Sequence, residues 1–438
     1  MRIGIIGECP YVPSSYGKVV LWLSKGLMDQ GFDVSVYCPS APSVLTFARY
    51  MEFKHACESP EVCLDLPRPI RVWNERWACT EQGGDADIYV IYGSPYGEVE
   101  GKWVSRCSRI NKPVAGYFVT ESDVVPPILA KWLLHVDAVG FPTIAVSEAF
   151  MLDREVSEHH REYVIVPHGL PDYYFDVDRE RILSRGLDKL GRDREKARPL
   201  IEARAKKKLI GLLAKDHPRK DVSSILVSFI RLLRSDGDAK LFLALVRSVG
   251  FPVWNLSLMI NQLGLGANDV YVIDPEASDI GLTEFGILYS YSLINVLAFP
   301  TYGESFGLPP VEAGALGVPP VITSTPVTRE IWGDYPLLVK SRAIMTYEGM
   351  ILHETDSTDL YEKIRTALGD PDKYGLIARR VSSKYRLDVM ARSFTRLAKL
   401  AEDRLGTKKP HDPEKNKYDL DNPYYQEVIL NILSSGEK

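Results

Sequence analysis

The sequence predicts an α/β protein with two domains, each built on a parallel sheet, that face each other across a cleft. Its 438 residues are too many for one ordinary core and suit two domains. In both halves, short apolar segments alternate with helical ones, which is typical of parallel strands joined by helices. Between the halves lies a highly charged stretch at residues 178–208.

The N-terminal half contains the first set of predicted strands, which are Arg2–Ile6, Asp33–Tyr37, Asp87–Tyr92, Pro113–Val119, Ala138–Phe141 and Tyr163–Val166. An amphipathic helix is expected at Lys18–Gln30, and Gly31 is placed to end it. Pro167-His168-Gly169 interrupts the alternation. We therefore place the first domain at residues 1–170.

The second half repeats the pattern, with predicted strands at Leu209–Leu213, Lys240–Val246, Val270–Ile273, Val296–Phe299 and Pro320–Ser324. Helices are expected at Asp221–Arg234, Val253–Leu263 and Thr283–Tyr291. We place the second domain at 209–385, after a charged helical connection at 171–208. Residues 386–438 are expected to hold C-terminal helices and a polar tail.

Composition narrows the classes of function. The chain is 45% hydrophobic and 25% charged with a net charge of −5, as in soluble globular proteins. A nucleic-acid partner would call for a basic domain, which is lacking. The apolar start is too short for a signal peptide, and no run approaches the roughly 20 apolar residues of a membrane-spanning helix. These features predict a cytoplasmic protein.

Six cysteines all lie in the N-terminal quarter: Cys9, Cys38, Cys57, Cys63, Cys79 and Cys107. None forms a Cys-x-x-Cys pair, which argues against a zinc site. We expect buried free thiols. A Cys57–Cys63 disulfide would need an unusual redox setting.

Basic residues are frequent between Arg179 and Lys208. One interpretation is a solvated helical insertion before the second domain. The other is a patch that touches anionic lipid or an anionic acceptor, which would make the protein peripheral to a membrane. Periodicity does not separate the two.

The densest motif follows the predicted strand Val296–Phe299. A loop carries Glu304, and a helix is expected to begin near Leu308–Pro310, because proline is tolerated in the first turn. Glu312 lies on the first turns of this helix, which Gly317 ends. The free N–H groups of the helix start would face the ligand crevice at the carboxyl ends of the strands, where a diphosphate fits on charge grounds.

The segment from Glu304 to Glu312 resembles the Glu-x7-Glu signature of the retaining glycosyltransferases of family 4, which have the GT-B fold: two Rossmann-like domains across a cleft, with a C-terminal helix returning toward the N-terminal domain. The resemblance implies that Glu304 contacts the donor sugar and Glu312 the ribose. Backbone amides near Ser305, and those of Phe306, Gly307 and Leu308, would bind the sugar and diphosphate.

Val166-Pro167-His168-Gly169 looks like the family's hinge after the first domain. The segment 211–220 looks like its Gly-Arg…Lys-Gly region, whose cations hold the donor diphosphate. Lys220 matches the family Lys, but Ala214 stands in place of the Arg. Lys215 or Arg219 could supply the second charge, and the sequence does not decide between them.

Weaker landmarks complete the resemblance. Gly17 matches the family's glycine loop near the donor phosphate. Where the family often has a His lining the sugar pocket, this chain has Glu121, which either contacts sugar or acceptor hydroxyls or is a plain loop acid. Glu330 lies in a stretch that runs beneath the donor in the family, although a structural role is as well supported.

No metal ligand is predicted, because the Asp-x-Asp patterns at 85–87 and 419–421 lie outside the expected crevice. The resemblance implies a metal-independent, cofactor-free, retaining hexosyltransferase that uses a nucleoside-diphosphate sugar and an acceptor that the sequence does not identify. Two alternatives stay open. One is a sugar-nucleotide epimerase on the same fold, and the other is a catalytically silent subunit that binds nucleotide sugar.

Overall fold

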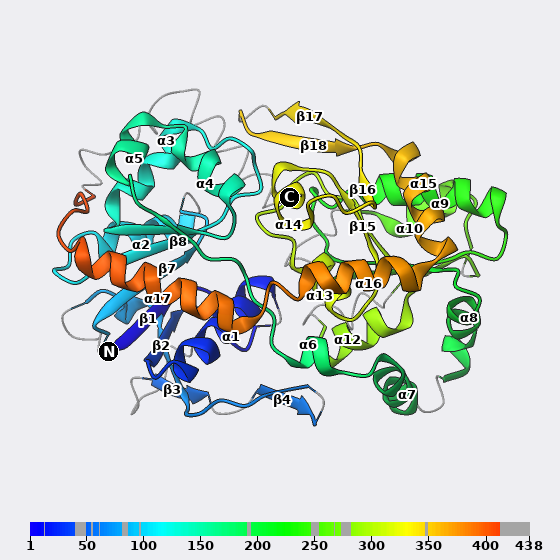
Figure 1. Ribbon diagram of the computed structural model, residues 1–438, viewed down its shortest axis with the longest axis horizontal. Helices are drawn as coiled ribbons and strands as arrows, with labels where there is room; N and C mark the ends of the chain where they lie inside the picture. Colours follow the sequence, from blue (N-terminus) through cyan, green and yellow to red (C-terminus); the bar gives the residue numbers. More distant parts are fainter. Residues whose placement is uncertain are drawn as a thin grey trace.

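Two parallel sheets form the framework of the protein, seen in a computed structural model (Figure 1). The structure describes residues 1–12, 14–39, 50–53, 56–60, 62–80, 86–95, 98–190, 194–246, 254–266, 268–272, 282–346 and 349–411. The two sheets lie side by side along the long axis of the molecule. The predicted α/β architecture is confirmed.

The first sheet has the strand order β10-β9-β8-β7-β1-β2-β6-β3. Its strands are β1 (Arg2–Ile6), β2 (Asp33–Cys38), β3 (Tyr50–Phe53), β6 (Ile70–Asn74), β7 (Ile88–Gly93), β8 (Val114–Phe118), β9 (Ala138–Phe141) and β10 (Val164–Ile165). All pair in parallel except β3, which is antiparallel to β6. The edge strand β3, its neighbour β6 and the small hairpin β4 (Ala56–Ser59)–β5 (Val62–Leu64) were not predicted.

Helices cover the first sheet and follow its strands. They are α1 (Ser15–Asp29), α2 (Glu98–Cys107), α3 (Pro127–Ala130), α4 (Ile144–Met151) and α5 (Arg154–His159), with short 3₁₀ turns at Glu75–Trp77 and Lys131–His135. Ser14 caps α1, its Oγ accepting from the Gly17 N–H. The apolar side of α1 is buried through Val19, Val20, Leu23 and Leu27, which recur at helical spacing.

The second sheet has the order β13-β12-β11-β14-β15-β16, and its pairs are parallel. Its strands are β11 (Leu209–Lys215), β12 (Lys240–Val246), β13 (Val270–Val272), β14 (Val296–Phe299), β15 (Pro320–Thr323) and β16 (Leu338–Val339). Its helices are α9 (Val222–Ser235), α10 (Leu256–Gln262), α12 (Glu284–Leu293), α13 (Leu308–Ala315), α14 (Pro326–Trp332), α15 (Ser357–Gly369) and α16 (Pro371–Ser382). An antiparallel hairpin, β17 (Ser341–Met345)–β18 (Ile351–Thr355), extends from this sheet toward the first domain.

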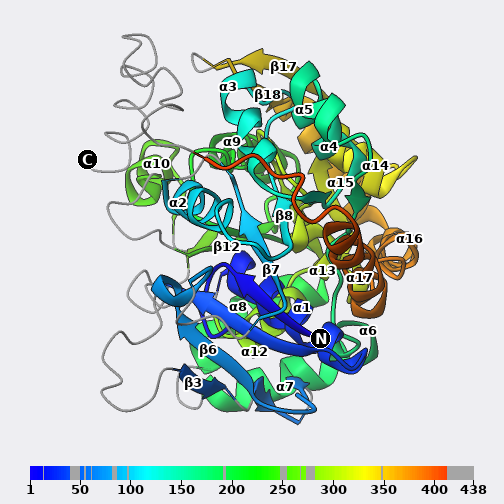
Figure 2. The ribbon, with the colours of Figure 1, turned by 90° about the vertical axis from the view of Figure 1, so that its left-hand side faces the viewer.

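The chain crosses between the domains twice, and the two crossings lie side by side. Leu170 donates its N–H to the Tyr385 carbonyl, and Leu387 donates to the Leu170 carbonyl, both at 2.9 Å. The second crossing leads into α17 (Leu387–Asp403), which packs along α1 and the first sheet (Figures 1 and 2). The predicted return of a C-terminal helix to the first domain is confirmed.

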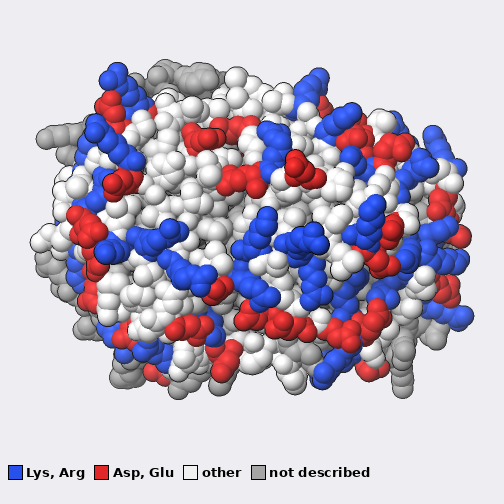
Figure 3. Space-filling view, viewed as in Figure 1, with Lys and Arg blue, Asp and Glu red and all other residues white. Residues whose placement is uncertain are grey.

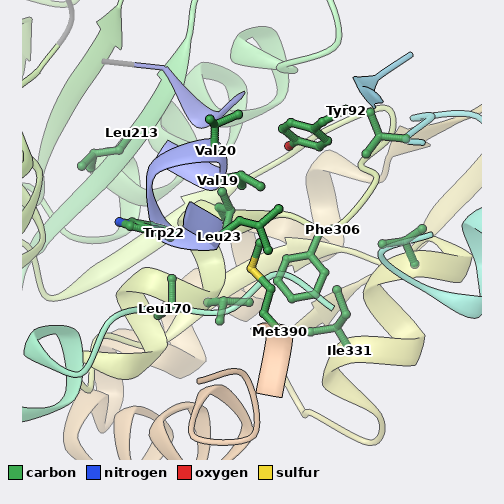
Figure 4. Close-up of a cluster of buried hydrophobic side chains, with 14 of the residues drawn as sticks. Val19, Val20, Trp22, Leu23, Tyr92, Leu170, Leu213, Phe306, Ile331 and Met390 are labelled. Carbon is green, nitrogen blue, oxygen red and sulfur yellow. The ribbon is translucent and has the colours of Figure 1, made fainter. Parts of the chain in front are cut away.

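Buried apolar side chains join the two domains. Figure 4 shows Val19 and Leu23 of α1 gathered with Phe306, which precedes α13, and with Met390 of α17. Phe306 is 1% exposed and Met390 is fully buried. The side chain of a predicted site residue, Phe306, is thus part of the core between the domains, which holds the segment 304–312 against the first domain.

The expectation of free thiols is wrong. The structure pairs Cys9 with Cys38, Cys57 with Cys63 and Cys79 with Cys107. Cys9 follows β1 and Cys38 is the last residue of its parallel neighbour β2, so their Cα atoms lie 5.2 Å apart, within disulfide reach. Cys57 and Cys63 face each other across the β4–β5 hairpin. Neighbouring strands bring the first two pairs together, whereas Cys79 lies after the turn Glu75–Trp77 and Cys107 ends α2. The spacing of the cysteines along the chain did not reveal the pairs.

The charged connection folds as α6 (Tyr173–Asp176), α7 (Arg179–Leu190) and α8 (Arg194–Ala205). Arg179 donates to the Ile294 carbonyl at 2.9 Å, and Arg204 donates to the Ser292 carbonyl at 3.0 Å. Lys207 and Lys208 pair with aspartates of the second domain. Figure 3 shows the Lys and Arg of this part of the surface interspersed with Asp and Glu. These contacts favour the interpretation as a solvated helical connection.

Candidate functional site

The N-terminus of α13 has the features of an anion site. Gly307 caps the helix in a left-handed conformation, with φ of 83°, and Pro309 and Pro310 occupy its first turn. Since proline lacks an N–H, the donors here are the backbone amides before it. Among the hydrogen bonds of the described residues, none uses the N–H of Ser305, Phe306, Gly307 or Leu308. Four adjacent amides are therefore available to a ligand.

Next to these amides, Glu304 is held by two cations. Arg219 Nη1 donates to Glu304 Oε1 at 2.6 Å, and Lys220 Nζ donates to the same oxygen. The Thr301 hydroxyl donates to it at 2.9 Å. In the described part of the structure no contact involves Glu304 Oε2, although the residue is only 6% exposed. That oxygen can accept from a ligand hydroxyl.

The ionisation of this cluster follows from burial and mutual charge. Burial would raise the pKa of Glu304, but Arg219 and Lys220 lower it below the usual glutamate value. Burial and the neighbouring Arg219 lower the pKa of Lys220 to about 8, despite Glu304. Lys220 is thus a buried cation that can lose its proton just above neutral pH.

Arg219 also connects the cluster to the first domain. Its Nη2 lies 3.4 Å from Oε1 of Glu121, which follows β8. Beside Glu121, the Asp123 N–H donates to the Ile351 carbonyl at 3.1 Å, and Asp123 Oδ2 lies 2.6 Å from His353 Nε2 on β18. The residues that follow β8 therefore meet the cluster from the opposite domain.

Glu312 has different surroundings, although it lies on the same helix. Lys18 Nζ, from α1 of the first domain, donates to Glu312 Oε1 at 2.6 Å. The Tyr291 hydroxyl donates to Oε2 at 2.8 Å. Lys18 also lies 3.1 Å from Glu284 Oε2 and donates to the Tyr174 hydroxyl at 3.1 Å. Both oxygens of Glu312 have a partner, and one cation serves two carboxylates.

Charge balance raises the pKa of Lys18. Burial alone would lower this pKa, but Glu284 and Glu312 outweigh it and hold the value above that of an ordinary lysine. Lys18 therefore stays protonated wherever the protein is folded near neutral pH. Tyr291, also buried, has its pKa raised well above 10 by burial and then by Glu312, so it remains a hydrogen-bond donor.

The structure places the remaining predicted residues, Lys215, Arg219, Gly17 and Glu330, in different surroundings. Lys215 is exposed at the end of β11, whereas Arg219 reaches Glu304, so the structure brings Arg219 to the cluster. A Cβ on Gly17 would come within 2.3 Å of the Val12 carbonyl oxygen, which explains a glycine there through the turn itself. Glu330 accepts from the Ile144 and Ala145 amides at 2.8 and 2.9 Å, at the start of α4 in the other domain.

Sequence reasoning missed Lys18, Tyr174, Glu284 and Tyr291 as neighbours of Glu312. They come from α1, α6 and α12, elements far apart along the chain. Lys18 directly follows a predicted site residue, Gly17, and that was the available signal. The Asp-x-Asp patterns fall partly or wholly outside the described residues, within which no group of three or more His, Cys, Asp and Glu could hold a metal ion.

Part of the second domain matches a known protein family. Residues 281–384, which include Glu304 and Glu312, match the family described as glycosyl transferases group 1. No curated protein sequence matches the chain. No helix in the described residues is both long and apolar enough to cross a membrane.

Several solved structures share the fold over nearly the whole chain. Sucrose-phosphate synthase from Thermosynechococcus elongatus has a TM-score of 0.64 at 14% identity, over 92% of this chain and 99% of that one. HepE from Anabaena, in complex with UDP and glucose, has a TM-score of 0.63 at 14% identity, covering 90% and 98%. The catalytic domain of starch synthase IV from Arabidopsis thaliana, bound to ADP and acarbose, has 0.62 at 12%, covering 92% and 99%.

At these identities the likeness concerns the fold. Its coverage includes both domains and the crossings between them. The chain has the GT-B fold seen in these glycosyltransferase structures, and residues 281–384 of its second domain match the glycosyl transferases group 1 family.

Proposed function

We propose that this protein is a retaining, metal-independent glycosyltransferase that moves a hexose from a nucleoside-diphosphate sugar to an acceptor hydroxyl. The observation that carries the proposal is the juxtaposition of Lys220 and Arg219 with four unpaired backbone amides at the start of α13. Fixed cations and amides aimed at one place stabilise negative charge that grows on a departing diphosphate.

Most of the predicted residues have a role in the proposed reaction. Lys220 and the amides of 306–308 neutralise the leaving diphosphate, and Arg219 supplies the second charge that Ala214 lacks. Glu304 Oε2 accepts a hydrogen bond from a sugar hydroxyl, while Oε1 orients Lys220. Glu312 accepts hydrogen bonds from the ribose hydroxyls. Glu121, which reaches Arg219 from the first domain, lies on the acceptor side.

Transfer then needs no carboxylate nucleophile. The acceptor hydroxyl attacks the anomeric carbon on the face that the diphosphate leaves, and the leaving oxygen takes its proton. Contacts between the domains, such as Asp123 with His353 and Glu330 with the start of α4, hold the domains together and limit the access of water. Structures similar to this one are complexes with UDP, ADP or UDP-glucose, which supports a nucleotide-sugar donor.

The test is a screen of purified protein against UDP-, ADP- and GDP-glucose by thermal shift and by release of nucleoside diphosphate, with sugar and glycolipid acceptors. Stabilisation by one donor and acceptor-dependent release, both lost in Glu304→Ala and kept in the surface variant Glu362→Ala, would support the proposal. Conversion of the donor without acceptor would indicate an epimerase instead.

A second candidate is a subunit that binds nucleotide sugar without turnover. Ala214 in place of the family Arg favours it, as does the engagement of both Glu312 oxygens by Lys18 and Tyr291. Stabilisation by a donor with no transfer to any acceptor would support this second function and contradict the first.

A further inference from the structure

Lys18 brings a positive charge from the first domain to Glu312 of the second. Its ammonium group has three N–H donors. Glu312 at 2.6 Å, Glu284 at 3.1 Å and the Tyr174 hydroxyl at 3.1 Å account for all three. The ammonium also lies 4.9 Å above the ring of Trp22, one turn further along α1. Its position is thus defined on every side, and it has no donor left for a phosphate.

The carboxylate of Glu312 is fixed by this arrangement. Lys18 bonds to Oε1 and Tyr291 to Oε2, so the plane of the carboxylate is held by one partner on each oxygen. A carboxylate oxygen has two lone pairs, and each oxygen here uses one. The second lone pair of each can still accept, and two adjacent acceptors suit the two hydroxyls of a ribose.

Lys18 also separates two carboxylates that lie close together. Glu284 and Glu312 share Lys18, and both are largely shielded, with side chains 14% and 4% exposed. Without the cation the two negative charges would repel each other across this shielded place, and Glu312 would lose the partner that fixes its Oε1.

We propose that Lys18 is a positioning residue that holds the carboxylate of Glu312 oriented for the ribose of the donor nucleotide, so that ribose recognition depends on the contact between the two domains. This rests on the proposed function, which places the ribose at Glu312. Since Lys18 comes from α1 and Glu312 from α13, the complete ribose site exists only when the domains are in contact.

The experiment measures binding of UDP and ADP, and of their 2′,3′-dideoxy analogues, by calorimetry to the full chain. Four proteins are compared: wild type, Lys18→Met, Lys18→Arg and Lys25→Met. Lys25 lies on the same helix and pairs with Asp29 at the surface, which makes it a matched control. Thermal melts of each confirm the folded fraction, and Lys18→Arg keeps the charge if Lys18→Met folds poorly.

Hydrogen bonds to charged groups indicate a preference of about tenfold or more for the ribose form in the wild type. We expect Lys18→Met to lose most of this preference by weakening the ribonucleotide alone, Lys18→Arg to restore part of it, and Lys25→Met to keep it. An unchanged preference in Lys18→Met, or tighter ribonucleotide binding, would overturn the inference. A wild type that binds neither nucleotide would instead refute the proposed function, and the inference with it.

Discussion

Two carboxylates at the ends of one motif lie in different electrostatic surroundings. Glu304 is held through Oε1 by two cations, Arg219 and Lys220, and Arg219 also lies 3.4 Å from Glu121. Glu312, on the helix that follows, shares Lys18 with Glu284, so two carboxylates share one cation. Glu304 keeps Oε2 for a ligand, while each oxygen of Glu312 already accepts one bond.

Because of this difference, the two ends of the segment 304–312 suit different chemical groups. The Glu304 end, with its two cations and the unpaired amides at the start of α13, suits a diphosphate. The Glu312 end, where two carboxylates share one cation, disfavours phosphate and suits neutral hydroxyls. A nucleotide sugar carries both groups in a fixed order, so the two ends are expected to bind it in one orientation. The following predictions test each end of the segment.

Removal of Lys220 should have the largest effect. We expect Lys220→Met to lower kcat by about 10²–10³-fold, because one preorganised charge on the leaving group is lost. Its thermal midpoint should stay close to that of the wild type, since Arg219 still neutralises Glu304. Steady-state kinetics with the donor found in the screen, together with a thermal melt, measure both. Full turnover in this variant would remove Lys220 from the mechanism.

Arg219 and Lys215 are the next comparison, because either could replace the charge that Ala214 lacks. Arg219→Met should weaken kcat/KM by about 10- to 100-fold through loss of a charged hydrogen-bonding group. Lys215→Met should change it by less than about threefold, as for an exposed charge. The reverse order in a kinetic assay would show that the donor draws Lys215 into the site.

At the negative end, Glu312→Gln should raise the donor KM by about tenfold and leave kcat within a few-fold, since ribose binding is the same in the ground and transition states. The matched variant Glu362→Gln, on an exposed surface of α15, should behave as wild type. A fall in kcat with no change in KM would place Glu312 at the reacting centre instead.

The smallest expected effect is on pH dependence. The pKa of Lys220 is lowered to about 8, and the protonated form is the one that stabilises the diphosphate. In the free enzyme kcat/KM should therefore be level below pH 8 and fall about tenfold per pH unit above it. In Lys220→Arg, whose guanidinium stays charged, the fall should vanish. The same fall in the arginine variant would assign it to another group.

Much of the framework could be predicted from the sequence because strands and caps are local. Lys240–Val246 and Val296–Phe299 have the predicted bounds, and α13 begins at Leu308 as expected. Pro300 ends the run Val296–Phe299, and the prolines after Leu308 mark the first turn of the helix, so no distant contact is needed to place these two elements.

The remainder depends on contacts between distant parts of the chain. The Cys9–Cys38 pair follows from the alignment of β1 with β2, and Lys18 meets Glu312 only after the domains come together. Arg219 and Lys215 look equivalent in the sequence, yet the turn after β11 sends one to Glu304 and leaves the other exposed. The residue types in the sequence therefore indicated what kind of site to expect, but only the fold shows which of the candidate residues lie together.

The most direct test of the account is a crystal structure of the protein with the nucleoside diphosphate that stabilises it. We expect the diphosphate to contact the amides of Phe306, Gly307 and Leu308 within reach of Lys220. The ribose hydroxyls should donate to Glu312. A nucleotide bound in the reverse direction, with its ribose at Glu304, or bound away from α13, would contradict it.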